Sequence, residues 1–157
     1  MADPRRALER HVVKVQRTIR SCSGCGMCCT DRYNAVQILP IEGQRIADHL
    51  NELPEEQRSE WQRRIEATIR KHRLREDGKP RLYTCAFLED DFRCALPLDV
   101  KPTACLSFNP ITEDSCDQEP ERYESAHQGV ITENRKAGLD ATLNSIPIAV
   151  RAALRDP

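Results

Sequence analysis

One short cysteine-rich stretch constrains this chain more than any other feature of its sequence. Residues 22–29 read C-x-x-C-x-x-C-C and contribute Cys22, Cys25, Cys28 and Cys29. Glycines stand between these cysteines, and glycine permits the backbone angles that are needed to turn several thiols toward one point. Four more cysteines follow singly, and they are Cys85, Cys94, Cys105 and Cys116. We expect this CxxCxxCC motif and some of the later cysteines to close around a metal centre.

The N-terminal region bears on the redox state of the cysteines. Residues 1–20 have interspersed charges and no continuous apolar run, so they do not read as a secretory signal. We therefore expect a cytoplasmic protein, in which disulfides rarely persist and clustered cysteines serve as metal ligands or catalytic thiols. The even total of eight cysteines keeps a disulfide framework as the alternative.

Length and composition predict one domain spanning residues 1–157. Hydrophobic residues make up 39% and charged residues 31% of the chain, as in ordinary globular domains. Aromatic residues make up only 4%, so a metal centre would supply cohesion that bulky side chains usually provide. A net charge of −1 does not indicate nucleic acid as a partner, and no apolar run reaches the ~18 residues of a membrane span. The expected partner is a metal ion or cluster, with a protein partner left open.

Apolar periodicity predicts a mostly helical α+β fold, with helices around a small cysteine-rich core of loops and a hairpin. Helices are expected at residues 4–20, 40–53, 55–76 and 120–137, and from Pro147 onward. Prolines between residues 79 and 118 oppose long helices. Strands are expected at residues 30–38, 82–88 and 92–96, and a polar loop before Cys116. The hairpin of the last two strands would bring Cys85 and Cys94 together.

The order of the cysteines resembles a known family. After the CxxCxxCC motif come Cys85-Ala86-Phe87-Leu88, then Cys94, then Lys101-Pro102 and Cys105. This arrangement is similar to that of the YkgJ-like cysteine-cluster proteins, a family of zinc- or iron-chelating domains that read C-P-F-L, a turn and a cysteine, then R-P-x-x-C. The resemblance covers about residues 20–110, and residues 120–157 would form a C-terminal helical extension.

This chain departs from the family pattern at two positions. Ala86 replaces the usual proline, and Lys101 stands where arginine is commoner. Neither departure removes a sulfur atom, but the second puts an arginine-specific contact in doubt. The resemblance implies metal ligands at Cys22, Cys25, Cys28, Cys29, Cys85, Cys94 and Cys105. Cys116 lies outside the family spacing and is either a plain thiol or a ligand.

Soft thiolate ligands favour zinc, copper(I) or iron–sulfur units over magnesium or calcium. A structural zinc takes four ligands, and a cubane cluster also takes four cysteines, so zinc and an iron–sulfur cluster both remain open. The density of the CxxCxxCC motif favours the cluster slightly. Because neighbouring side chains usually diverge, Cys28 and Cys29 are expected to serve two metals, or one of them is spare. The four histidines show no metal spacing.

Two classes of function follow from a metal centre. The first is a non-enzymatic metal-binding module. The second is an iron–sulfur redox or radical-type enzyme or accessory protein, for which flagellin lysine methylases, with a similar cysteine cluster, suggest a link to protein lysine methylation. The sequence contains no P-loop, no Rossmann glycines and no Ser/His/Asp constellation, so no catalytic residue is assigned and enzyme status stays open.

Overall fold

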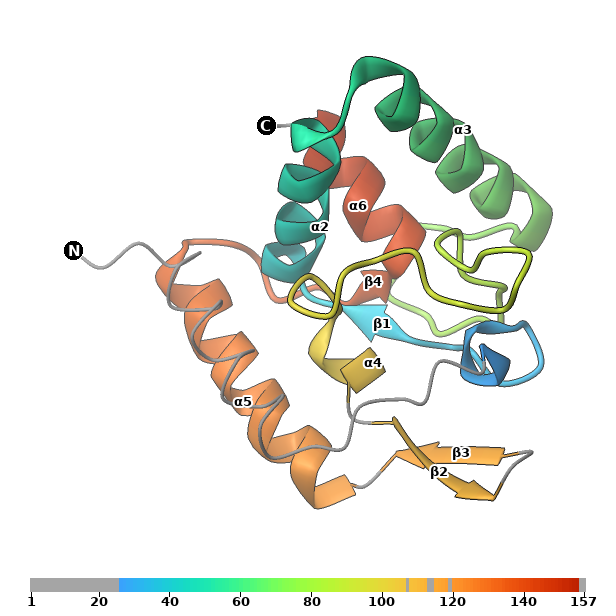
Figure 1. Ribbon diagram of the computed structural model, residues 1–157. Coiled ribbons are helices and arrows are strands. Elements are labelled where there is room, and N and C mark those ends of the chain that lie inside the picture. The colour runs from blue at the N-terminus through green and yellow to red at the C-terminus, as the bar shows by residue number, and fades with distance from the viewer. Residues whose placement is uncertain (1–25, 107, 113–114, 119, 156–157) are drawn as a thin grey trace.

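The computed structural model describes residues 26–106, 108–112, 115–118 and 120–155 (Figure 1). The helix expected at residues 4–20 and the first two motif cysteines, Cys22 and Cys25, lie outside the described residues.

Helices dominate the described chain, which confirms the mostly helical α+β class. The helices are the 3-10 helix η1 (Met27–Cys29), α2 (Pro40–Glu52), α3 (Glu55–His72), α4 (Thr103–Leu106), α5 (Pro120–Lys136) and α6 (Ile146–Arg155). Two small antiparallel sheets pair β1 (Gln37–Ile38) with β4 (Asn144–Ser145), and β2 (Phe108–Thr112) with β3 (Ser115–Gln118). Among the described residues, no helix combines the length and apolar character that crossing a bilayer requires.

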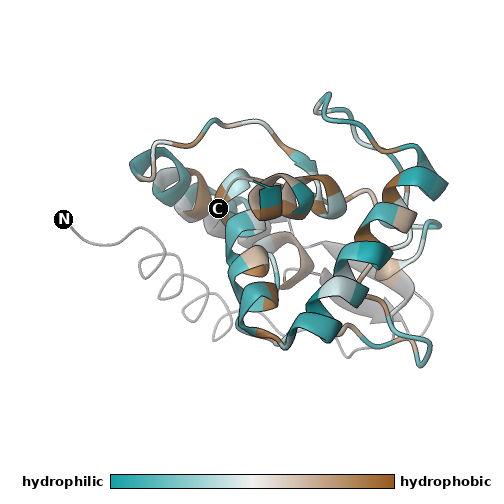
Figure 2. Ribbon diagram, turned by 90° about the horizontal axis from the view of Figure 1, so that it is seen from above, coloured by the Kyte–Doolittle hydropathy of each residue, from teal (hydrophilic) through white to brown (hydrophobic). Residues whose placement is uncertain are grey.

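The main hydrophobic core lies between α2, α3 and α6. Its fully buried side chains include Leu50 of α2, Ile65 of α3 and Ile148 of α6. Figure 2 shows hydrophobic residues gathered where these helices meet and hydrophilic residues on their outer sides. The loop that follows α3 joins this core through Phe87, whose ring lies 5.3 Å from that of Trp61. Through Phe87, the same core supports the loop that carries Cys85 and Cys94.

Three elements match the sequence prediction closely because proline and glycine set their ends. Pro40 occupies the first position of α2, where its missing N–H costs nothing. Gly138 follows α5 in a left-handed conformation, with φ of 72°, and its N–H donates to the Arg135 carbonyl. The last helix, α6, begins at Ile146, one residue before the expected Pro147.

Other predicted boundaries are wrong. Helix α3 ends at His72 and not at residue 76, because Arg73 adopts a left-handed conformation and its N–H bonds back to the carbonyls of Arg70 and Ile69. The strand expected at residues 30–38 is reduced to Gln37–Ile38, since residues 30–33 form a turn closed by a hydrogen bond from Tyr33 N–H to the Thr30 carbonyl.

The hairpin expected at residues 82–96 forms no strands. Its turn is present, with a single bridge between Leu88 and Cys94 and a hydrogen bond of 2.8 Å from Glu89 N–H to the Arg93 carbonyl. The N–H groups of Tyr83 and Cys85, before the turn, bond instead to the carbonyls of Asn34 and Cys29, so they do not extend a ladder. The polar loop expected before Cys116 is instead the hairpin β2–β3, whose register shift at Pro110 accommodates a residue without an N–H.

Gly43 permits α2 and α6 to cross closely. A Cβ at this position would lie 2.8 Å from the Ala149 carbonyl oxygen, which is closer than carbon and oxygen atoms pack. The nearest atoms that such a Cβ would meet belong to the backbone of α6, so the clash cannot be relieved by rotation of a side chain. The close packing of α6 on α2 therefore depends on the lack of a side chain at Gly43.

We expect Gly43→Ala to destabilise the protein. In an unconstrained helix the same change would stabilise by up to ~1 kcal/mol, but overpacking here should cost about 1–3 kcal/mol. Chemical denaturation measures the free energy of unfolding. Asn51→Ala, on the exposed side of α2, is the control and should be neutral or slightly stabilising. A Gly43→Ala protein as stable as this control would show that the crossing can relax.

Candidate metal centre

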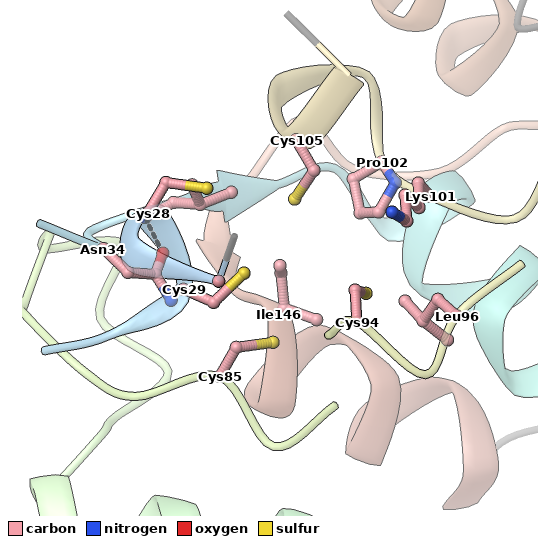
Figure 3. A pocket seen from close by; sticks show the side chains of 12 residues that line it. Cys28, Cys29, Asn34, Cys85, Cys94, Leu96, Lys101, Pro102, Cys105 and Ile146 are labelled. Atoms are coloured by element: carbon pink, nitrogen blue, oxygen red, sulfur yellow. Dashed lines mark hydrogen bonds between the residues drawn. The ribbon is translucent and has the colours of Figure 1, made fainter. Parts of the chain in front are cut away.

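Five cysteines from three separate segments line one pocket. They are Cys28, Cys29, Cys85, Cys94 and Cys105. Figure 3 shows the sulfur ends of Cys28, Cys29, Cys85 and Cys105 turned toward a common space, with Cys94 at one side of it. The cavity has a volume of about 40 Å³, which exceeds the ~10–15 Å³ that one water molecule needs and is far below the ~300 Å³ of a small-molecule site.

Backbone hydrogen bonds place Cys85 beside the CxxCxxCC motif. The Cys85 N–H donates to the Cys29 carbonyl at 2.7 Å, and the Tyr83 N–H donates to the Asn34 carbonyl at 2.9 Å. These two bonds join the last residue of the motif, and the segment after it, to the segment before the turn at residues 89–93. The two cysteines are therefore held together by main-chain contacts that require neither a disulfide nor a metal.

Gly26 brings the motif against the turn that precedes Cys94. Gly26 has φ of 73°, and a Cβ added to it would collide with the carbonyl group of Phe92. Its carbonyl accepts a hydrogen bond of 3.0 Å from Cys29 N–H, which closes the turn of η1. Phe92 itself has a left-handed φ of 62°. Two unusual backbone conformations thus meet where the first and second cysteine segments touch.

Tyr83 connects the pocket to the C-terminal helix. Its side chain is fully buried, its hydroxyl donates to the Val36 carbonyl at 2.7 Å, and it accepts from the Ile146 N–H at 3.1 Å. Burial, with a further contribution from the nearby Cys85 and Cys105 thiols, raises the pKa of Tyr83 well above its usual value. Because Ile146 also lines the pocket, α6 begins at the pocket wall.

The thiols lie in an environment that favours their neutral form. Burial raises the pKa of Cys85 to about 12, and the neighbouring Cys94 and Cys28 thiols add to the rise. Burial likewise raises the pKa of Cys105 well above 9, with contributions from Cys85, Cys94 and Cys28. Cys105 keeps some exposed surface, but its sulfur faces the pocket. Four thiols therefore lie within electrostatic reach of one another, and a cation between them would relieve the repulsion of their ionised forms.

The described cysteines fit a soft metal by chemistry, although their present positions do not coordinate one. All five are free thiols, so the disulfide alternative does not apply to them. Within the described ranges, no three metal-ligating side chains converge closely enough to hold an ion. Cys22 and Cys25, two of the predicted ligands, lie outside those ranges. The structure thus brings five of the seven predicted ligands to one pocket.

The remaining candidate residues lie elsewhere. Cys116 is on β3 opposite Pro110, and β3 packs against η1, so this strand lies beside the CxxCxxCC motif. Of the histidines in the described segments, none lines the pocket, and the His72 Nε2 instead accepts a hydrogen bond from the Thr84 N–H. Lys101, the position where arginine is commoner in the family, does line it.

Sequence reasoning missed the residues that arrange the pocket. No role was assigned to Tyr83 or Glu42 from the sequence. Neither carries a local signal of its part in the pocket, because the hydrogen bonds concerned join it to backbone groups that are distant in the sequence.

Comparisons with known proteins give no relative. No family model matches the chain, and searches of curated proteins and of solved structures also find no match. The resemblance to the YkgJ-like family consequently stays a prediction from the cysteine motif and its spacing.

We expect Gly26→Ala to destabilise the protein more than Gly138→Ala does. Both glycines have φ near 70°, but nothing lies within 4 Å of a Cβ at Gly138. The control therefore incurs only the left-handed strain of about 1–2 kcal/mol, whereas Gly26→Ala adds a clash worth about 1–3 kcal/mol. Denaturant titration of the two variants measures the difference. Equal losses would mean that the motif does not rest on the turn at Phe92.

Proposed function

We propose that this protein is a cysteine-cluster metal-binding module that holds zinc or an iron–sulfur cluster. The observation that carries the proposal is the shared pocket, in which free thiols from three segments meet. The proposed ligands are Cys28, Cys29, Cys85, Cys94 and Cys105, together with Cys22 and Cys25. A cytoplasmic address, in which thiols stay reduced, is part of the proposal.

Simple hydrophobic packing would not produce this arrangement. A free cysteine behaves as a small apolar residue, and a core can bury one or two of them for that reason alone. Here five of the twelve side chains around one cavity are cysteines. Protein interiors are densely packed and rarely leave voids, so a cavity of about 40 Å³ ringed by thiols supports the presence of a guest.

The thiol set and the pocket restrict the chemistry of that guest. Thiolates select soft metals, and the number of cysteines exceeds the four ligands of a single zinc. Ionised thiolates around a divalent ion leave net negative charge, which the ammonium group of Lys101 at the pocket wall would offset. A bound zinc or cluster would cross-link the three segments, and its binding free energy would contribute to folding.

The small pocket supports a module rather than an enzyme that binds an organic substrate beside its metal. Small-molecule sites occupy roughly 300 Å³ or more, and the cavity among the cysteines has about 40 Å³. The alternative is an iron–sulfur redox or radical-type protein related to lysine methylation, and its radical-type form would need room for a substrate beside the metal, which the cavity among the described residues does not have.

We expect protein purified without oxygen to contain stoichiometric metal. Elemental analysis, an assay for acid-labile sulfide and a visible spectrum identify it. Iron with sulfide and a broad brown absorption would indicate a cluster, and colourless protein with zinc would indicate an ion. A protein that contains neither, and that takes up neither on reconstitution, contradicts the proposal.

We expect Cys85→Ser and Cys94→Ser to lose metal and stability together, because a structural site couples binding to folding. Metal content and the free energy of unfolding are measured on the same preparations. Cys116→Ser serves as the comparison and should have a mild effect. Full metal occupancy in the Cys85 or Cys94 variant would remove that residue from the ligand set, and strong loss in the Cys116 variant would add β3 to it.

A further inference from the structure

The buried carboxylate of Glu42 joins two segments that are distant in the sequence. Only 6% of the surface of Glu42 is exposed. Its Oε2 accepts a hydrogen bond of 3.3 Å from the Leu39 N–H, and its Oε1 accepts one of 2.9 Å from the Thr103 N–H. Thr103 is the first residue of α4, the helix that carries Cys105. One carboxylate thus caps the start of α2 and fixes the start of α4.

Burying the carboxylate of Glu42 costs free energy, so we look for an interaction that an apolar side chain at this position could not make. Burial raises the pKa of Glu42, although the two backbone donors oppose that rise. Capping α2 alone would not require such burial, because a small polar residue at the Leu39 position could satisfy its free N–H groups. The hydrogen bond to Thr103 is the contact that only a long buried acceptor on α2 supplies.

The helix that carries Cys105 depends on such outside support. Helix α4 is four residues long and is therefore not stable by itself. At its C-terminal end, Leu106 is buried against Leu39 and Ile41 near the start of α2. At its N-terminal end, the Thr103 N–H is held by Glu42. Cys105 lies between these two anchors, with its sulfur facing the pocket (Figure 3).

We propose that Glu42 is a positioning residue for Cys105. Through the Thr103 N–H, its carboxylate holds α4 so that the Cys105 sulfur stays in the pocket with Cys28 and Cys85. Glu42 is not itself a metal ligand in this role, since each of its oxygens already accepts a backbone hydrogen bond. The effect on metal affinity rests on the proposed function, whereas the placement of Cys105 does not.

Three variants isolate this hydrogen bond. Glu42→Gln preserves the shape of the side chain but replaces one acceptor oxygen with an NH₂ donor, so the two buried backbone donors compete for one acceptor. Thr103→Pro removes the N–H itself and leaves Glu42 in place, at a first helical position where proline is tolerated. Glu52→Gln, the same substitution at the exposed end of α2, is the matched control.

The first readout does not need a metal. The full-length, metal-free protein is treated with iodoacetamide at one pH, and alkylation at each cysteine is followed by peptide mass spectrometry. Alkylation requires the thiolate, so its rate reports local opening together with the pKa of the thiol. The charge of Glu42 raises the pKa of Cys105, so Thr103→Pro, which keeps that charge, is the variant whose rate reports opening without this effect. We expect the rate at Cys105 to rise about tenfold in Glu42→Gln and in Thr103→Pro, because each leaves a buried polar group unsatisfied, while the rate at Cys85 stays unchanged. The combined variant should exceed neither single variant, since both remove one interaction.

Three results would overturn the inference. An unchanged rate at Cys105 would mean that other contacts place α4. Parallel acceleration at all five cysteines would mean that Glu42 contributes only to global stability. Faster alkylation of Cys105 in Thr103→Pro but not in Glu42→Gln would mean that the Glu42 carboxylate does not determine where Cys105 lies.

The second readout is the affinity for Zn²⁺, measured by competition with a chromophoric chelator. Residues that orient metal ligands typically change affinity about 10–100-fold, and we expect a loss of that size in both variants but not in Glu52→Gln. Equal affinities in the wild-type and variant proteins would overturn the positioning role. If the wild-type protein binds neither Zn²⁺ nor a cluster, the proposed function fails, and the alkylation rates still decide whether Glu42 places Cys105.

Discussion

The hydrogen bonds from Cys85 N–H to the Cys29 carbonyl and from Tyr83 N–H to the Asn34 carbonyl hold the first two cysteine segments of the pocket together. They fix the loop after α3 against the last residue of the CxxCxxCC motif and the segment that follows it. Ordering irregular chain of this kind costs roughly 1–2 kcal/mol per residue in backbone entropy, and no extended sheet compensates for it here. The loop is ordered because its backbone groups find partners in another irregular segment, and because Phe87 and Leu96 join the main core.

Buried polar side chains extend the same principle to the rest of the fold. Asn134 of α5 accepts a hydrogen bond from the Ile41 N–H and donates to the carbonyls of Leu139 and Asp140. Glu42 and Tyr83 likewise serve backbone groups of other segments. A buried polar group without a partner is costly, so each of these residues favours one arrangement of loops and helix ends over alternatives. Specificity in this chain therefore comes from polar contacts at helix ends as much as from the apolar core.

The difference between local signals and long-range polar contacts explains how far the sequence could predict the structure. The helices α2 and α5 follow from local signals, because proline, glycine and apolar periodicity act within one or two turns. The strands expected at residues 82–96 failed for the opposite reason, since the N–H groups of Tyr83 and Cys85 bond to Asn34 and Cys29, which are about fifty positions away. Asn134 lies within the helix predicted at residues 120–137, yet its side chain accepts a hydrogen bond from the start of α2, which no local pattern indicates.

The candidate site shows the same limit. The family resemblance implied which thiols belong together, and five of those seven cysteines line one pocket. It gave no indication that Gly26 and Phe92 would meet backbone to backbone, or that Lys101 would share the pocket wall. Cys28 and Cys29 were expected to point apart, yet both line the same cavity, because η1 is a tight turn beside it.

Burial of the thiols is compatible both with the apolar pocket that the structure shows and with the metal site that we propose. Neutral thiols are nearly apolar, so Cys85 and Cys105 can be buried without a partner, and their raised pKa values express that preference. A soft cation binds the thiolate, so each ligand must release a proton when the metal enters. In the proposed function, a metal would replace these protons within a framework that main-chain hydrogen bonds and the Glu42 contacts already arrange. The entropic cost of ordering the loops would then be met largely before binding. A protein with such a centre would need its metal less for folding than a protein whose cysteines are brought together by the ion alone.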